Sequence, residues 1–361
     1  MPFRDGLPIA RVAGIEIRLS LAWVLMLAVV TLVGAEGAQE VDASLRDPVA
    51  WALGAVIAGL FLGSMIAHEL AHALTARLRG IDPGAVVLGL TGQMAPLEVE
   101  GRTARDELAI AAAGPLVSLG ITLVLVPVGV VLDDARGITD AVALGVLLLA
   151  LLNAALAGLG LLPALPLDGG RIVRALAWWR TSDVDRASRF TVTVSRYVGW
   201  WLMALGVTFA IVLRPDIGIV VLALGWFIST GARVMQRRLG LEQALRGVLV
   251  SDALERDVPR VAPQLTLDTF ADSAVKSGAT SVPVIADDRV VGVVGLDKIR
   301  RVARRSWPTT RAGDVMAVPP AAPFLTPDDP FWDALELLRT TGLDGLAVVD
   351  EGVLTGMFTR H

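Results

Sequence analysis

Two of the chain's three histidines lie four residues apart in the segment HELAH, at His68 and His72. On an α-helix, residues i and i+4 lie on one face, so both imidazoles can reach one metal ion. Glu69 follows the first histidine and is placed to take a proton from an attacking water molecule. The alternative is a histidine pair that only forms hydrogen bonds inside a helical bundle. Because ionisable groups in apolar segments are costly and usually functional, the pattern favours a metal site.

A third ligand is needed, because a catalytic zinc takes three protein ligands and leaves one position for water. The chain has no cysteine, which excludes thiolate ligands, disulfides and cysteine nucleophiles. No third histidine lies nearby, so the ligand must be a carboxylate, and the best candidate is Asp168 in LLPALPLDGGR. Pro163 and Pro166 break the helix there, and broken helices recur at ion sites within membranes. Taken alone, the LDGG motif fits equally well a turn that ends a helix.

The elements around these residues are predicted to be membrane spans. Apolar residues make up 54% of the 361 positions and charged residues 19%, and the net charge of −4 gives no indication of nucleic acid binding. Arginines follow the second, fourth and sixth apolar segments, so the positive-inside rule puts both termini in the cytoplasm. Each segment is close to or longer than the length of about 20 residues that a span needs. The six predicted spans are 19–35, 50–76, 107–132, 139–166, 195–213 and 217–235.

Two further regions differ from the spans. The segment 85–100 (AVVLGLTGQMAPLEVE) is short and rich in β-branched residues, which predicts a β-hairpin at the membrane, with a plain loop hairpin as the alternative. After about Arg246 the composition becomes that of a soluble α/β domain. Here VPVIADDRVVGVVG aligns with LAVVDEGVLTGMFT, an internal repeat of about sixty residues. We therefore expect a polytopic α-helical membrane domain with a membrane-associated β-hairpin (1–240), followed by cytosolic α/β repeats at 246–306 and 312–361.

Three motifs together resemble the site-2 protease family: HELAH within a span, Ala113-Gly114-Pro115 opening the next span, and LPALPLDGGR at the fourth. The resemblance covers nearly the whole chain and points to the bacterial and archaeal branch with a C-terminal pair of CBS domains. It implies an intramembrane zinc metalloendopeptidase with one Zn²⁺ held by His68, His72 and Asp168, and with Glu69 as general base. The substrate it implies is a transmembrane segment, for example of a membrane-bound anti-sigma factor. Cleavage would occur near the cytoplasmic side of the bacterial plasma membrane, as regulated intramembrane proteolysis.

The resemblance also suggests where the substrate binds. Segment 85–100 resembles the family's membrane-associated sheet, to which a substrate can add as a strand, with contacts at Gly92, Gln93 and Met94. Asn153 is a further candidate for contacting the substrate. The family usually has an asparagine eight residues before the ligand aspartate, but Gly160 stands there. Because losing one such donor elsewhere costs about a hundredfold or more in rate, a catalytically idle zinc-binding protein is an alternative.

Other positions carry weaker expectations. Ser118 stands where many relatives have asparagine, and we expect its hydroxyl to bond back to its own helix. CBS pairs commonly bind adenine nucleotides through an aspartate at the start of the helix after the second β-strand. Lys298 occupies this position in the first repeat, and in the second repeat the given sequence ends at His361 before this position is reached. A module for homodimerisation or substrate gating is therefore at least as well supported as a nucleotide sensor. A CBS-gated transporter is a third alternative, but it predicts an inverted repeat among the spans, and we find none.

Overall fold

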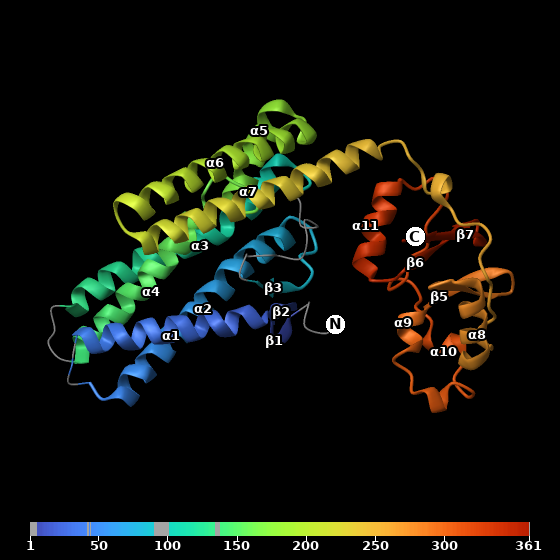
Figure 1. Ribbon diagram of the computed structural model, residues 1–361, viewed down its shortest axis with the longest axis horizontal. Coiled ribbons are helices and arrows are strands. Elements are labelled where there is room, and N and C mark those ends of the chain that lie inside the picture. Colours follow the sequence, from blue (N-terminus) through green and yellow to red (C-terminus); the bar gives the residue numbers. More distant parts are fainter. Residues whose placement is uncertain (1–5, 42, 44, 90–100, 134–137, 361) are drawn as a thin grey trace. The chain divides into compact units, whose positions relative to one another are not determined.

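The computed structural model describes residues 6–41, 43, 45–89, 101–133 and 138–360 (Figure 1). Two compact units make up the chain, Met1–Arg237 and Arg238–His361. The described part of the first unit has six helices that are long and apolar enough to cross a membrane, which confirms the six predicted spans. They are α1 (Leu21–Val41), α2 (Asp47–Leu78), α3 (Ala104–Asp133), α4 (Ile138–Gly160), α6 (Val184–Val212) and α7 (Pro215–Ala244), the last of which continues into the second unit.

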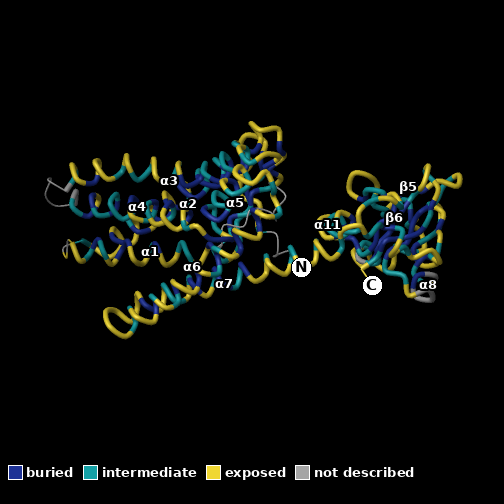
Figure 2. Tube along the Cα trace, turned by 90° about the horizontal axis from the view of Figure 1, so that it is seen from above, coloured by how far each residue is buried: buried dark blue, intermediate teal, exposed yellow. Residues whose placement is uncertain are grey.

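Large apolar side chains lie on both the inside and the outside of this helical unit. Trp23 of α1, Phe61 and Met65 of α2 and Leu149 of α4 pack together in a buried cluster. Exposed residues run along the outer sides of the helices (Figure 2), and many of them are apolar, such as Trp226 of α7. A helix that is apolar on all sides is typical of a membrane span, because lipid replaces water around it.

The fourth span ends earlier than predicted, at Gly160, and a short helix, α5 (Asp168–Thr181), begins after a turn. Pro163 and Pro166 lie in this turn, where they interrupt no helical hydrogen bond. Gly169 packs against the turn so closely that a Cβ atom there would lie 2.2 Å from the carbonyl oxygen of Leu162. The LDGG motif is therefore the first turn of a new helix, and the alternative of a turn that only ends a helix is wrong.

A small sheet lies beside the helices, in the order β1-β2-β3. Strands β1 (Leu7–Val12) and β2 (Ile15–Leu19) form an antiparallel hairpin that the sequence analysis did not predict. Strand β3 (Val86–Leu88) pairs with β2 in parallel and occupies the start of the segment predicted to form a membrane-associated β-hairpin. The rest of that hairpin, including Gly92, Gln93 and Met94, lies outside the described residues.

The second unit contains two copies of one helix-strand-strand arrangement. Every element of the second copy begins 64 residues after its counterpart, and both strand pairs have a bulge at the equivalent position. This regularity confirms the internal repeat. The first copy is α8 (Leu267–Ser277), β4 (Ser281–Ala286) and β5 (Arg289–Gly295), and the second is α11 (Phe331–Thr341), β6 (Gly345–Asp350) and β7 (Val353–Thr359). Three short turns of helix connect the copies, α9 (Leu296–Ile299), η2 (Arg304–Ser306) and α10 (Ala312–Val315), and a fourth, η1 (Val250–Ala253), precedes the first copy.

Candidate metal centre

The structure brings together the three residues predicted to hold a metal. His68 and His72 lie one turn apart on α2, and Asp168 is the first residue of α5. The two Nε2 atoms are 3.3 Å apart. Oδ2 of Asp168 lies 3.5 Å from Nε2 of His68 and 3.4 Å from Nε2 of His72. Three potential ligand atoms therefore form a nearly equilateral triangle.

This triangle has the size that zinc requires. In a tetrahedron with bonds of about 2.0–2.1 Å, the ligand atoms lie about 3.3–3.4 Å apart, which matches the three measured separations. The backbone of α3 leaves room beside the triangle at Gly114, where a Cβ atom would lie 2.1 Å from Nε2 of His72 and 2.6 Å from Nε2 of His68. The donor set of two imidazoles and one carboxylate is one that catalytic zinc sites use. The residues present therefore fit a zinc ion.

The far side of each imidazole ring is held by α3. Nδ1 of His72 lies 2.6 Å from the carbonyl oxygen of Ile110, an acceptor only, so this nitrogen carries the proton and donates it. Nδ1 of His68 lies 2.8 Å from Oγ of Ser118. If that nitrogen is also protonated, both Nε2 atoms keep a free electron pair toward the centre, as metal-ligating histidines require. The expectation that Ser118 bonds back to its own helix is wrong, because its hydroxyl faces the imidazole of α2.

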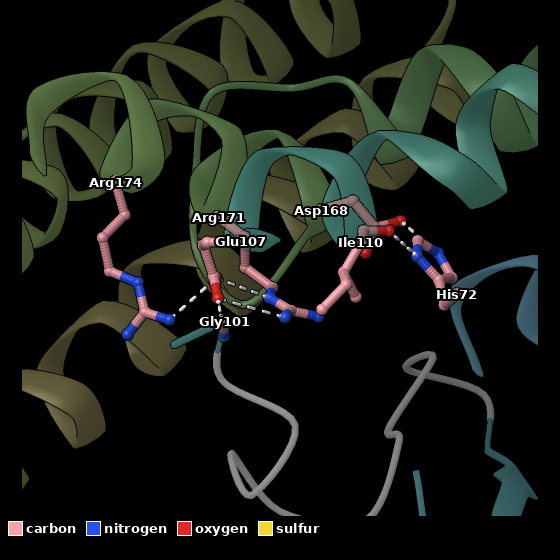
Figure 3. A network of polar contacts seen from close by, with 7 residues as sticks. All are labelled: His72, Gly101, Glu107, Ile110, Asp168, Arg171 and Arg174. Carbon is pink, nitrogen blue, oxygen red and sulfur yellow. Dashed lines mark hydrogen bonds and ion pairs between the residues drawn. The ribbon is translucent and has the colours of Figure 1, made fainter. Parts of the chain in front are cut away.

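A buried ion cluster fixes the start of α5 against α3 (Figure 3). Glu107, in the first turn of α3, is completely buried and accepts hydrogen bonds from Arg171 Nε at 3.0 Å and from Arg174 Nη2 at 2.8 Å. The backbone N–H of Gly101 also donates to Glu107, at 2.7 Å. Arg171 follows Asp168 by three residues and Arg174 follows Arg171 by three, so each lies about one turn of α5 after the one before it. The cluster therefore holds the helix that carries the third candidate ligand.

One face of α3 consequently contacts both histidines and the helix that carries Asp168. The residues concerned are separated by three, four and four positions, the spacing of a single stripe along a helix. The first residue of the stripe contacts α5 and the other three contact the imidazoles carried by α2, although α3 supplies none of the three candidate ligands. In chain order the stripe is Glu107, Ile110, Gly114 and Ser118.

Glu69, the predicted general base, is buried beside the two histidines on α2. Its carboxyl group interacts electrostatically with His72, Asp168 and Arg171. The side chains of His68 and His72 are 3% and 1% exposed, whereas that of Asp168 is 20% exposed. The centre is therefore most exposed on the side of Asp168.

The structure gives the two remaining predicted positions very different surroundings. Gly160 borders the centre, because a Cβ atom there would lie 3.5 Å from Oδ2 of Asp168. Asn153 is completely buried, and its Nδ2 donates to Ser64 Oγ at 3.2 Å and to Leu149 O at 2.9 Å. Its Oδ1 has no hydrogen-bond partner among the described residues. A contact between Asn153 and a substrate stays a prediction.

Sequence reasoning missed the ion cluster, although one signal was available. A carboxylate at the start of an apolar span is costly and requires a partner. Glu107 stands in that position, and arginines occur three and six residues after Asp168, the candidate ligand. Local sequence alone does not say that these segments meet, so the pairing was not predicted.

Known protein families and sequences are similar to this chain. The family model of the CBS domain matches residues 250–305 and 312–361. Rip3 of Mycobacterium tuberculosis H37Rv, which carries the name of a zinc metalloprotease, is 33% identical over 353 residues, covering 97% of this chain and 89% of Rip3. The zinc metalloprotease MJ0392 of Methanocaldococcus jannaschii is 25% identical over 352 residues, covering 97% of this chain and 92% of MJ0392.

A solved structure is also similar. The site-2 protease from Methanocaldococcus jannaschii is 25% identical and covers 63% of this chain and 94% of its own, with a TM-score of 0.41. The family follows from the relative with 33% identity, which is matched over most of its length. The chain belongs to the site-2 protease family of membrane zinc metalloproteases, in the branch with a C-terminal pair of CBS domains.

Proposed function

We propose that this zinc metalloendopeptidase hydrolyses a peptide bond in or near a transmembrane segment of another membrane protein. The triangle formed by Asp168 with His68 and His72, the two histidines lying within a candidate membrane span, carries the proposal. These three residues hold one zinc ion per chain, which when bound supplies the Lewis acidity that polarises a peptide carbonyl and activates water.

The chain's own residues supply the remaining chemistry. Glu69 accepts the proton of the attacking water and then delivers it to the leaving amine, as a buried carboxylate next to the first ligand can do. Asp168 contributes one negative charge and keeps the net charge of the centre low. Its partly exposed side admits the water that hydrolysis consumes. Ile110 and Ser118 hold the imidazole rings in position through Nδ1.

The orientation and the soluble part belong to the same proposal. Arginine-rich loops support a bacterial plasma membrane location with both termini in the cytoplasm. In that orientation α2 ends in the cytoplasm, and His68 lies ten residues, or about 15 Å, before that end. The CBS pair at 246–306 and 312–361 gates access of the substrate to the membrane domain (1–240) and assembles as a homodimer. Support for the gating comes from α7, a single helix that continues from one unit into the other.

The test is cleavage of a model transmembrane substrate by the purified full-length chain in detergent, with zinc content measured for every sample. Glu69→Gln should bind one zinc per chain and cleave at least about a hundredfold more slowly, because it lacks the proton acceptor. Glu40→Gln removes an exposed carboxylate at the end of α1 and should match the wild type. A wild type that binds no zinc would overturn the proposal.

One observation favours a second candidate function, a zinc-binding membrane protein without peptidase activity. No amide stands at position 160 beside Asp168, where the family usually has one. The same experiment separates the two functions. If the wild type binds zinc but cleaves none of several transmembrane substrates, and Glu69→Gln changes nothing, the idle protein is the better description.

A further inference from the structure

A cavity of about 370 Å³ lies between α6 and α7, shares no residue with the metal centre and has a cationic lining. None of its lining residues is acidic, and two of them carry permanent positive charges. The two helices come close together just beside it, because a Cβ atom on Gly199 would lie 2.3 Å from Oγ of Ser229. The five lining residues are Arg196, Trp200, Ser229, Arg233 and Gln236.

The donors of this pocket have few acceptors inside the protein. Arg196 places its guanidinium over the ring of Trp200, 5.3 Å from the centroid, and donates to Gln236 Oε1 at 3.4 Å. Arg233 donates to the hydroxyl of Thr230 at 3.0 Å. Neither guanidinium forms an ion pair with a carboxylate in the described part of the chain. The buried hydroxyl of Ser229 likewise has no partner among the described residues.

This chemistry fits an anion with several oxygen atoms. Each guanidinium has five N–H donors in a planar fork that matches the geometry of phosphate or carboxylate oxygens. Two such groups on facing helices can each bind a separate oxygen of one phosphate. A phosphate in the pocket would also supply acceptors to the unused donors of Arg196 and Arg233.

The depth of the pocket indicates where that phosphate comes from. After Arg196, the remaining sixteen residues of α6 carry no charge, and in α7 no charge occurs between Asp216 and Arg233. Sixteen helical residues span about 24 Å, close to the thickness of a bilayer's hydrocarbon core. Both arginines therefore lie at the edge of the hydrocarbon layer, at the level of lipid headgroups. Tyr197 and Trp201 are exposed beside them, as expected for aromatic residues at this interface.

The surface beyond the pocket suits acyl chains. Trp200, Val207 and Ile211 follow Arg196 along one side of α6, and all three are exposed. Trp226 and Ile219 are the corresponding exposed residues on α7. A lipid whose phosphate occupies the pocket can therefore lay its chains on apolar side chains of both helices.

We infer that the pocket between α6 and α7 binds the phosphate of an anionic phospholipid through Arg196 and Arg233. Basic pockets between membrane helices are known to select anionic headgroups, and each basic residue near such a surface contributes measurably to binding. A zwitterionic lipid carries the same phosphate, but its ammonium group would lie beside two arginines. The site therefore prefers a lipid with net negative charge.

Native mass spectrometry of the full-length chain in detergent tests this inference. The added lipid is dioleoyl-phosphatidylglycerol or dioleoyl-phosphatidylcholine, and a third sample receives inorganic phosphate. We expect the wild type to retain one phosphatidylglycerol molecule in preference to phosphatidylcholine. Arg196→Gln and Arg233→Gln should each weaken that retention about fivefold. Arg180→Gln, which removes an exposed arginine of α5 outside the pocket, should leave it unchanged.

Three results would overturn the inference. The first is equal retention of phosphatidylglycerol and phosphatidylcholine by the wild type. This result needs no variant, so it counts even if the variants fail to fold. The second is unchanged retention of phosphatidylglycerol by Arg196→Gln or Arg233→Gln when that variant elutes as a folded monodisperse species. Competition by millimolar inorganic phosphate that removes the lipid entirely would assign the pocket to a soluble anion.

Discussion

The carboxylate of Glu107 in α3 accepts a hydrogen bond at 2.8 Å from Nη2 of Arg174 in α5, and both side chains are buried. Arg171 contacts the same carboxylate. Breaking a buried ion pair by removing one partner is strongly destabilising. The pair therefore fixes the helix whose first residue, Asp168, is the third candidate ligand of the metal centre.

Replacing Glu107 should weaken zinc binding although the residue is no ligand. Glu107→Gln removes the negative charge that Arg171 and Arg174 contact, so α5 and Asp168 lose their fixed position. We expect zinc affinity to fall about 10- to 100-fold, as for other residues that orient metal ligands. The measurement is zinc retention against increasing chelator. The control is Asp106→Asn, whose ion pair with Arg79 is more exposed; equal zinc loss in both variants would contradict this role.

Removing the hydroxyl of Ser118 should also lower zinc affinity. Ser118→Ala removes the hydroxyl that contacts His68 Nδ1. Without this hydrogen bond, the imidazole ring is no longer held in one orientation. A loss of about tenfold or more is expected from competition with a zinc indicator. Thr122→Val is the matched control, since this hydroxyl one turn later bonds to the Ser118 carbonyl oxygen of its own helix. Unchanged affinity in Ser118→Ala would show that the hydrogen bond does not orient the ligand.

A methyl group at position 114 should abolish zinc binding. In Gly114→Ala the added Cβ would lie 2.1 Å from Nε2 of His72, closer than any stable contact, so α3 must move away from the ligands. Gly120→Ala on the same helix meets nothing within 4 Å, and alanine favours a helix over glycine by about 1 kcal/mol. Zinc content of the two purified variants is the measurement. A Gly114→Ala protein that carries a full complement of zinc would show that the helices adjust.

An amide at position 160 should increase the rate of cleavage. Gly160→Asn places a donor beside Asp168, where it can stabilise the developing negative charge, and a gain of about tenfold or more in kcat is expected. Gly160→Ala is the control, because its Cβ fits at 3.3 Å from Pro115 and 3.5 Å from Asp168 without adding a donor. If both variants change kcat equally, packing rather than the amide is responsible.

The membrane orientation can be tested with single cysteines, since the chain has none. A membrane-impermeant maleimide should label Glu40→Cys in intact spheroplasts and label Arg180→Cys only after lysis. These residues lie at exposed positions near opposite ends of the span helices. Labelling of Arg180→Cys in intact spheroplasts would reverse the orientation.

Local sequence was sufficient for parts of this structure and insufficient for others. The six spans follow from composition and length, and the HELAH spacing puts two imidazoles on one face because an α-helix has 3.6 residues per turn. The repeat of the second unit was visible by alignment. Each of these features depends on residues that are close together in the chain.

Features that depend on distant residues could not be predicted. The pairing of β2 with Val86–Leu88 joins segments about 70 residues apart, and no local pattern encodes such a partner. Ser118 in a span would by default bond to its own helix, and only the packing of α3 on α2 brings it to His68. The arginines that follow Asp168 indicated a cytoplasmic loop, whereas they belong to α5 and contact Glu107.

The stripe of Glu107, Ile110, Gly114 and Ser118 makes the centre depend on the rotational phase of α3. Each residue of an α-helix advances the side-chain direction by about 100°. A single residue inserted between Glu107 and Ser118 would turn one part of the stripe away from the site while the other part kept its place. The same insertion after Ser118 would leave all four contacts in phase. The number of residues in α3 between Glu107 and Ser118 is therefore constrained by the site, whereas the number after Ser118 is not.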